Sequence, residues 1–184
     1  MKQFLAGNVL LILCCIFYLA WWIVAFRPTD PIKGMRSGWL LVPAVVFGLA
    51  AVAVISGGIS AADSARQLLP TMRIVVFGIA AYVILLLGTG VLLHRQVTTE
   101  LFLIVGWAVL ACAEISALYA HEVYTAGAAW LFIAIVIALA AVSLVCYLLY
   151  YNLDARTGWI DGIIPLAVIA VVMAAMNLTI VLRQ

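Results

Sequence analysis

Residues 101–122, LFLIVGWAVLACAEISALYAHE, hold one ionisable side chain, Glu114, deep inside an otherwise apolar run. The run is long enough to cross a bilayer, because a transmembrane helix needs about 20 mainly apolar residues. An acidic side chain at the centre of a membrane costs roughly 2.5 to 3.5 kcal/mol, so such groups usually face a bundle interior or a water-filled cavity. The stretch therefore predicts a membrane helix with a polar environment around Glu114.

The composition of the whole chain agrees with this prediction. Its 184 residues are 69% hydrophobic and 9% charged, with a mean hydropathy of +1.32, whereas soluble domains carry about 25% charged residues. This composition excludes a water-soluble fold. The formal net charge of +2 and the lack of a long basic run exclude nucleic acid as a partner.

Similar apolar runs recur along the chain and predict an all-α fold, a bundle of six transmembrane helices that forms one domain over residues 1–184. Aromatic clusters such as FYLAWWIVAF at residues 17–26 are typical of the membrane interface, so the lipid bilayer is the expected surrounding. The predicted helices cover residues 4–26, 39–55, 72–93, 101–122, 128–151 and 160–182.

The connections and the glycines add three expectations. In the connection at residues 56–70, the segment AADSARQLL could form a short amphipathic helix at the interface. The segment LDARTGWIDG at residues 153–162 is predicted to be a connection as well. Gly78, Gly88 and Gly90 would let neighbouring helices approach the third predicted helix closely.

The first apolar run resembles a signal peptide in its position, but it lacks a small-residue cleavage site and continues into an aromatic end. We therefore expect a retained transmembrane helix. The compact chain and its short connections favour an integral protein of the bacterial inner (plasma) membrane.

Three intramembrane polar residues are expected at a similar depth. With a rise of 1.5 Å per residue, Glu114 lies about 20 Å from the start of its helix and Asn177 about 25 Å from the start of the last helix. Asn8 lies only about 6 Å from the start of the first helix, which runs the opposite way. The three residues should therefore share one leaflet.

These residues and several aromatic ones predict a polar pocket. Trp107, Glu114 and His121 recur at intervals of seven, so they share one stripe of a helix. For Glu114, the alternative is a hydrogen bond to a neighbouring Ser, Asn or backbone carbonyl; for Asn8 and Asn177, it is a hydrogen bond between packed helices. The candidate ligand-binding residues are Glu114, Trp107, His121, Tyr119, Asn177, Asn8 and Tyr82.

The sequence indicates neither a metal nor a cofactor. Its four cysteines lie inside predicted helices without CxxC spacing and are expected to pack as small apolar residues. His94 and His121 end successive helices on opposite membrane faces, so the two imidazoles cannot bind one haem iron. No catalytic residue is assigned.

Three functions fit these features. The first is a protein that binds or transports a small solute, in which Glu114 carries a proton or pairs with a cationic group. The alternative is an accessory subunit or homo-oligomer whose small-residue faces, Ala134/Ala138 and Ala170/Ala174, dock a partner helix. The third, an intramembrane lipid or quinone enzyme with Glu114 or His121 as general base, lacks a second catalytic group.

Overall fold

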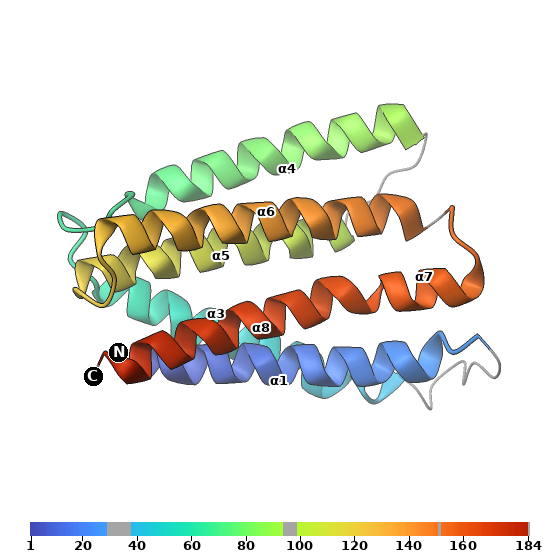
Figure 1. Ribbon diagram of the computed structural model, residues 1–184, viewed down its shortest axis with the longest axis horizontal. Coiled ribbons are helices and arrows are strands. Elements are labelled where there is room, and N and C mark those ends of the chain that lie inside the picture. The colour runs from blue at the N-terminus through green and yellow to red at the C-terminus, as the bar shows by residue number, and fades with distance from the viewer. Residues whose placement is uncertain (29–37, 94–98, 151, 184) are drawn as a thin grey trace. The chain divides into compact units, whose positions relative to one another are not determined.

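The chain folds into α-helices that are long and apolar enough to cross a membrane. The computed structural model describes residues 1–28, 38–93, 99–150 and 152–183, and in this part of the chain it contains six such helices and no strand (Figure 1). The predicted all-α, six-helix architecture is confirmed. The long helices are α1 (Lys2–Ala25), α3 (Leu41–Ala61), α4 (Thr71–Leu93), α5 (Thr99–Ala120), α6 (Ala126–Tyr150) and α8 (Ile163–Leu182), the last preceded by a short helix, α7 (Ala155–Asp161).

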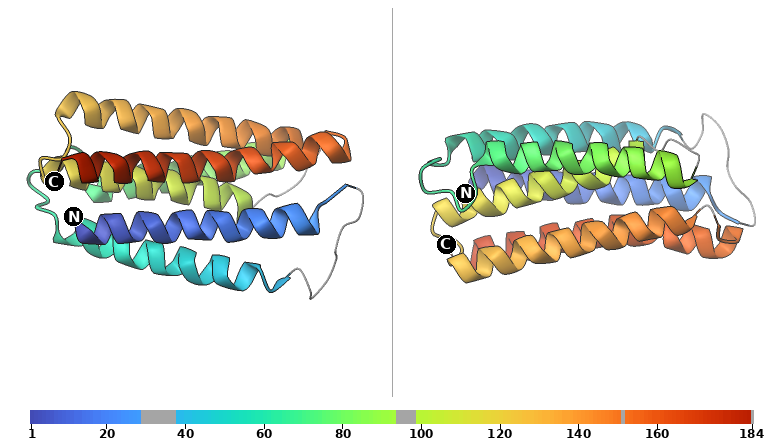
Figure 2. Two further views of the ribbon diagram at one scale, coloured as in Figure 1. Left: turned by 60° about the horizontal axis from the view of Figure 1, so that its bottom comes forward. Right: turned by 90° about the horizontal axis from the view of Figure 1, so that it is seen from above.

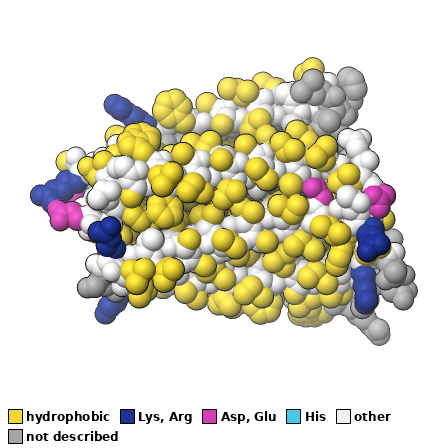
Figure 3. Space-filling view, in the orientation of Figure 1, with side chains coloured by type: hydrophobic (Ala, Val, Ile, Leu, Met, Phe, Trp, Pro, Cys, Tyr) yellow, Lys and Arg dark blue, Asp and Glu magenta, His cyan; other side chains and the backbone are white. Residues whose placement is uncertain are grey.

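The surface of the helices is that of an integral membrane protein. On the face drawn in Figure 3, hydrophobic side chains cover the middle of the helices, and the charged side chains that are coloured lie near helix ends. α4 illustrates this arrangement, because Met72, Phe77 and Leu87 along its length are all exposed. Exposed apolar helix surface of this extent fits a lipid surrounding.

The contacts within the chain divide it into two compact units. Unit 1 comprises Met1–Gly57 and Val145–Gln184, and unit 2 comprises Gly58–Leu144. The boundaries between the units fall inside α3 and α6. The single domain expected from the sequence stays a prediction.

In unit 1, α1 packs along α8 (Figure 1). At one end of this pair, the indole N–H of Trp22 donates a hydrogen bond of 3.0 Å to the backbone oxygen of Trp159. The Trp22 ring stacks on Phe26 with ring centroids 4.3 Å apart. Gly162 lies so close to the Trp22 ring that a Cβ atom there would overlap it. The lack of a side chain at Gly162 therefore permits this contact.

In unit 2, α4 packs against α5 (Figure 2). Gly78 of α4 faces the side chain of Val109 of α5, and a Cβ atom at Gly78 would overlap the Val109 methyl group. Gly88 and Gly90 have no such neighbour within 4 Å among the described residues. Close helix approach is therefore confirmed at Gly78, whereas the same expectation for Gly88 and Gly90 was wrong.

The predicted end of the second helix was also wrong. α3 continues through Gly57 to Ala61 instead of ending at residue 55. Because a bilayer offers no water to backbone N–H and C=O groups, keeping the helical hydrogen bonds outweighs the low helix propensity of glycine.

The segment AADSARQLL does not form the short helix expected of it. After Ala61 the Asp63 carboxylate accepts a hydrogen bond of 3.0 Å from the backbone N–H of Ala65, which closes a local turn. Such side-chain to backbone bonds compete with helix formation. The connection to α4 is therefore irregular up to Pro70.

The segment predicted to connect the last two helices is largely helical. α7 begins at Ala155 because the Asp154 carboxylate caps it, accepting from the backbone N–H groups of Arg156 at 3.2 Å and Thr157 at 3.3 Å. Hydrogen bonds from Thr157 hold the pKa of Asp154 below its ordinary value of 3.8, so the cap is ionised at neutral pH. The break before α8 at Gly162 follows from Pro165, which cannot donate to the carbonyl of Asp161.

α8 begins at Ile163, three residues after the predicted start at 160, and the remaining helix bounds agree with the prediction to within two residues at each described end. α5 begins at Thr99 and ends at Ala120, compared with the predicted 101–122. The residue that ends the fifth predicted helix, 151, and His94 lie outside the described residues.

We expect Gly78→Ala to lower the free energy of unfolding by about 1 to 3 kcal/mol, because the stiff Val109 side chain has to move away from the new methyl group. Gly88→Ala on the same helix is the matched control and should be neutral or stabilising by up to about 1 kcal/mol. Reversible unfolding of the purified protein in mixed detergents measures both. An equal response of the two variants would contradict the assigned contact.

Candidate functional site

Glu114 lies in the most buried span of the described chain. In α5, 56% of the apolar span is buried, compared with at most 28% in any other described span. Every residue from Ala111 to Leu118 is buried, and Glu114 has no exposed surface. Since this run covers all sides of the helix, the carboxyl group does not face lipid.

One face of α5 carries a stripe of buried residues with the helical spacing of three and four. It comprises Ile104, Trp107, Ala111, Glu114 and Leu118, all buried. Trp107 is only 6% exposed. Its indole N–H is buried and has no hydrogen-bond acceptor among the described residues. The stripe therefore presents a buried donor and a buried carboxyl group on one face.

The remaining candidates of unit 2 are not fully buried. His121 follows the stripe just beyond the end of α5 and is exposed, whereas Tyr119 is half-buried. Tyr82 of α4 is half-buried and packs edge-on against Phe102, with ring centroids 6.1 Å apart. Trp107 and Glu114 are thus the two candidates that share a buried face.

Asn8 and Asn177 belong to unit 1, where they join α1 to α8. The amide of Asn8 donates a hydrogen bond of 3.0 Å to the side-chain oxygen of Asn177. Asn177 in turn donates to the backbone oxygen of Leu5 at 3.3 Å. The hydrogen bond between packed helices, which was the alternative expected for these two residues, is present. A pocket that combines them with Glu114 stays a prediction.

Sequence reasoning missed the role of Ser116. Its hydroxyl group donates to the backbone oxygen of Leu69 at 2.7 Å and accepts from the backbone N–H of the same residue at 2.9 Å. Ser116 has no exposed surface. The irregular connection between α3 and α4 is thereby held against α5 two residues beyond Glu114. The sequence offers no signal for this contact, because the partner is a backbone.

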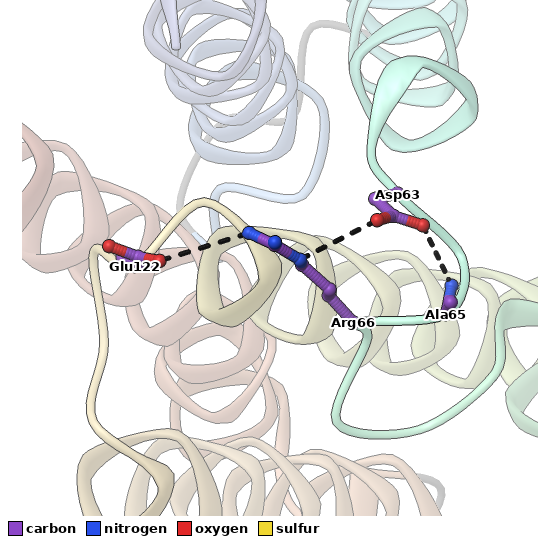
Figure 4. Close-up of polar contacts among 4 residues, drawn as sticks. All are labelled: Asp63, Ala65, Arg66 and Glu122. Carbon is purple, nitrogen blue, oxygen red and sulfur yellow. Dashed lines mark hydrogen bonds and ion pairs between the residues drawn. The ribbon is translucent and has the colours of Figure 1, made fainter.

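A second set of contacts joins the same connection to the end of α5. Arg66 lies between two acidic side chains, 3.7 Å from the Asp63 carboxylate and 4.0 Å from that of Glu122 (Figure 4). All three side chains are largely exposed, so each ion pair contributes little stability.

The end of α5 has the geometry of a Schellman motif. Glu122 adopts a left-handed conformation with φ of 62°, and the N–H of Val123 bonds to the oxygen of Leu118 at 3.0 Å. Val123 and Leu118, the two positions whose apolar side chains usually accompany this motif, are both buried. It fixes the direction in which the chain leaves α5.

The described residues contain no group of three His, Cys, Asp or Glu side chains arranged to hold a metal ion. Cys14, Cys15, Cys112 and Cys146 are free thiols within the long helices.

Comparison of the chain with models of protein families, with curated proteins and with solved structures found no match.

We expect Ser116→Ala to lower the free energy of unfolding by about 1 to 3 kcal/mol, because both backbone groups of Leu69 lose their partner. Hydrogen exchange at the Leu69 amide should become faster in the same variant. Thr89→Ala is the control: Thr89 also has a buried hydroxyl group, but it bonds to the oxygen of Leu85 in its own helix. Unchanged exchange at Leu69 in Ser116→Ala would contradict the assigned contact.

A double-mutant cycle tests the pair that joins α1 and α8. Asn8→Leu and Asn177→Leu should be coupled by about 0.6 kcal/mol, with an upper limit near 1.7 kcal/mol, as for other side-chain hydrogen bonds inside membrane bundles. Detergent unfolding of the two single variants and the double variant measures the coupling. Additive effects would show that the hydrogen bond does not stabilise this packing.

Proposed function

We propose that this chain is an integral membrane protein that binds or transports a small solute, with Glu114 as the group that recognises it. The observation that supports the proposal is the complete burial of this carboxyl group within an otherwise apolar helix. Ionisable side chains at such positions are costly and usually serve an ion or substrate pathway.

The chemistry of a buried carboxyl group limits the class of solute. In its ionised form the group attracts a cation more strongly than in water, because the surroundings have a low dielectric constant. In its neutral form it can carry a proton and donate a hydrogen bond. The proposed solute is therefore a cationic molecule, or one whose binding is coupled to a proton.

The proposed location is the bacterial inner membrane. The six long apolar helices support a bilayer surrounding. The short connections described between α5 and α6 and between α6 and α7 support a compact membrane protein without large external domains at these positions.

The melting temperature of the detergent-purified protein tests the proposal across a panel of alkylamines, guanidines, vitamins and lipids at several pH values. A probe that binds only the native state stabilises it by about 2.7 kcal/mol at a hundredfold excess over its dissociation constant. We expect a cationic probe to raise the melting temperature of the wild type and not that of Glu114→Gln.

Glu122→Gln is the matched control, since it removes an exposed carboxylate just beyond the end of the same helix. It should respond to the probe as the wild type does. Stabilisation that persists in Glu114→Gln would refute the assigned role of Glu114, provided that the variant is folded by its circular dichroism spectrum.

The alternative function is that of an accessory subunit of a membrane complex. Ala134 and Ala138 support it, because these small residues lie one turn apart on α6 and are both exposed. If no probe stabilises the wild type and Glu114→Gln melts as the wild type does, this alternative replaces the first proposal.

A further inference from the structure

We infer that the indole N–H of Trp107 is a second recognition point of the proposed site, so that its ligand is an elongated amine that carries a hydrogen-bond acceptor at its far end. This inference rests on the proposed function, because it assigns the cationic end of the ligand to Glu114. To the proposed function it adds the chemical class of the ligand and identifies Trp107 as a residue that determines specificity.

The first support is the state of the Trp107 side chain. It is only 6% exposed, and its N–H group is buried without an acceptor among the described residues. A buried donor without a partner costs about 1 to 3 kcal/mol, and native proteins keep few of them. An acceptor supplied by a ligand would remove this cost.

The indole N–H groups of Trp22 and Trp159 can be compared with that of Trp107. The Trp22 indole N–H donates to the Trp159 backbone oxygen at 3.0 Å. Trp159 also has a buried N–H without an acceptor among the described residues, but its side chain is half-exposed and lies in the short helix α7. Trp107 differs because its N–H lies inside a long span, on the same stripe as a buried carboxyl group.

The second support is the spacing along the stripe. Seven residues separate Trp107 from Glu114, which corresponds to about 10 Å along the helix axis and a difference of only about 20° around it. Long side chains of a helix generally lean toward its N-terminus, so we expect the distance between the polar atoms of the two residues to stay close to this value. A ligand that contacts both Trp107 and Glu114 therefore needs a hydrogen-bond acceptor about 10 Å from its charged nitrogen.

The third support is the residue between them. Ala111 lies on the stripe one turn from each, and it carries the smallest side chain that an α-helix accommodates without the cost of glycine. A ligand joining Trp107 to Glu114 would cross Ala111, so its middle part should be apolar and unbranched. Because Ala111 has no exposed surface, entry of the ligand displaces the groups that cover it.

The experiment compares two series of probes of graded chain length. One series consists of ω-aminoalkyl methyl ketones, and the other of alkylamines of the same length without the carbonyl group. For the wild type, the ketone whose carbonyl oxygen lies about 10 Å from the nitrogen should bind about tenfold more tightly than its matched amine, the value of one buried hydrogen bond. Titration calorimetry in detergent measures both affinities.

Trp107→Phe keeps an aromatic ring and removes the donor. In this variant the tenfold advantage of the ketone over its matched amine should disappear. Trp130→Phe is the control, since Trp130 is an exposed tryptophan of α6, and it should keep the advantage. If Trp107→Phe keeps the advantage too, the inference is overturned.

The result for Glu114→Gln separates this inference from the proposed function. Loss of amine binding in Glu114→Gln together with an unchanged ketone advantage in Trp107→Phe would overturn the inference alone. Amine binding that survives in Glu114→Gln would overturn both.

A measurement on the wild type covers the case in which Trp107→Phe does not fold. The six indole N–H resonances can be assigned by replacing the other tryptophans one at a time. Addition of the ketone should shift the Trp107 resonance, and addition of the matched amine should not. Equal shifts with both probes would contradict the inference.

Discussion

A backbone N–H or C=O group that is withdrawn from water has to find its partner within the protein. The connection between α3 and α4 meets this requirement at Leu69 through one hydroxyl group, that of Ser116, which both donates to and accepts from the same residue. This pair of bonds restricts the rotation of α5 about its axis. Glu114 lies two residues earlier on the helix, about 200° around it. The position of the carboxyl group therefore depends on a contact made on the other side of α5.

Length and apolar content were sufficient to predict the six long helices, because a chain in a bilayer has few alternatives to a helix. The same rule explains where the prediction was wrong. The pair Gly57 and Gly58 ends helices in water, but α3 continues through both. At Asp154 the error has the opposite origin. A polar segment resembles a connection in composition, yet its first carboxylate caps α7 and stabilises the helix that follows.

The candidate site could be predicted from the sequence only where a residue is exceptional by its type. Glu114 is noticeable because a carboxyl group inside an apolar run requires an explanation, and its burial agrees with that reasoning. Ser116 is not noticeable, since a serine in a membrane helix can bond to a carbonyl of its own helix, as Thr89 does with Leu85. Its actual partner, Leu69, lies far away in the sequence and acts through its backbone. No pattern of side chains encodes such a contact.

The polar groups within the long helices differ in how they are satisfied, and this difference carries the functional argument. Asn8 and Asn177 bond to each other, and Ser116 bonds to Leu69. Such pairs rigidify the helices that hold them. Rigid supports are also what a binding site needs, because groups that are already positioned do not lose conformational freedom when the ligand arrives. A donor such as the Trp107 N–H, held on a helix that Ser116 orients, is consequently worth more to a ligand than the same donor on a mobile segment.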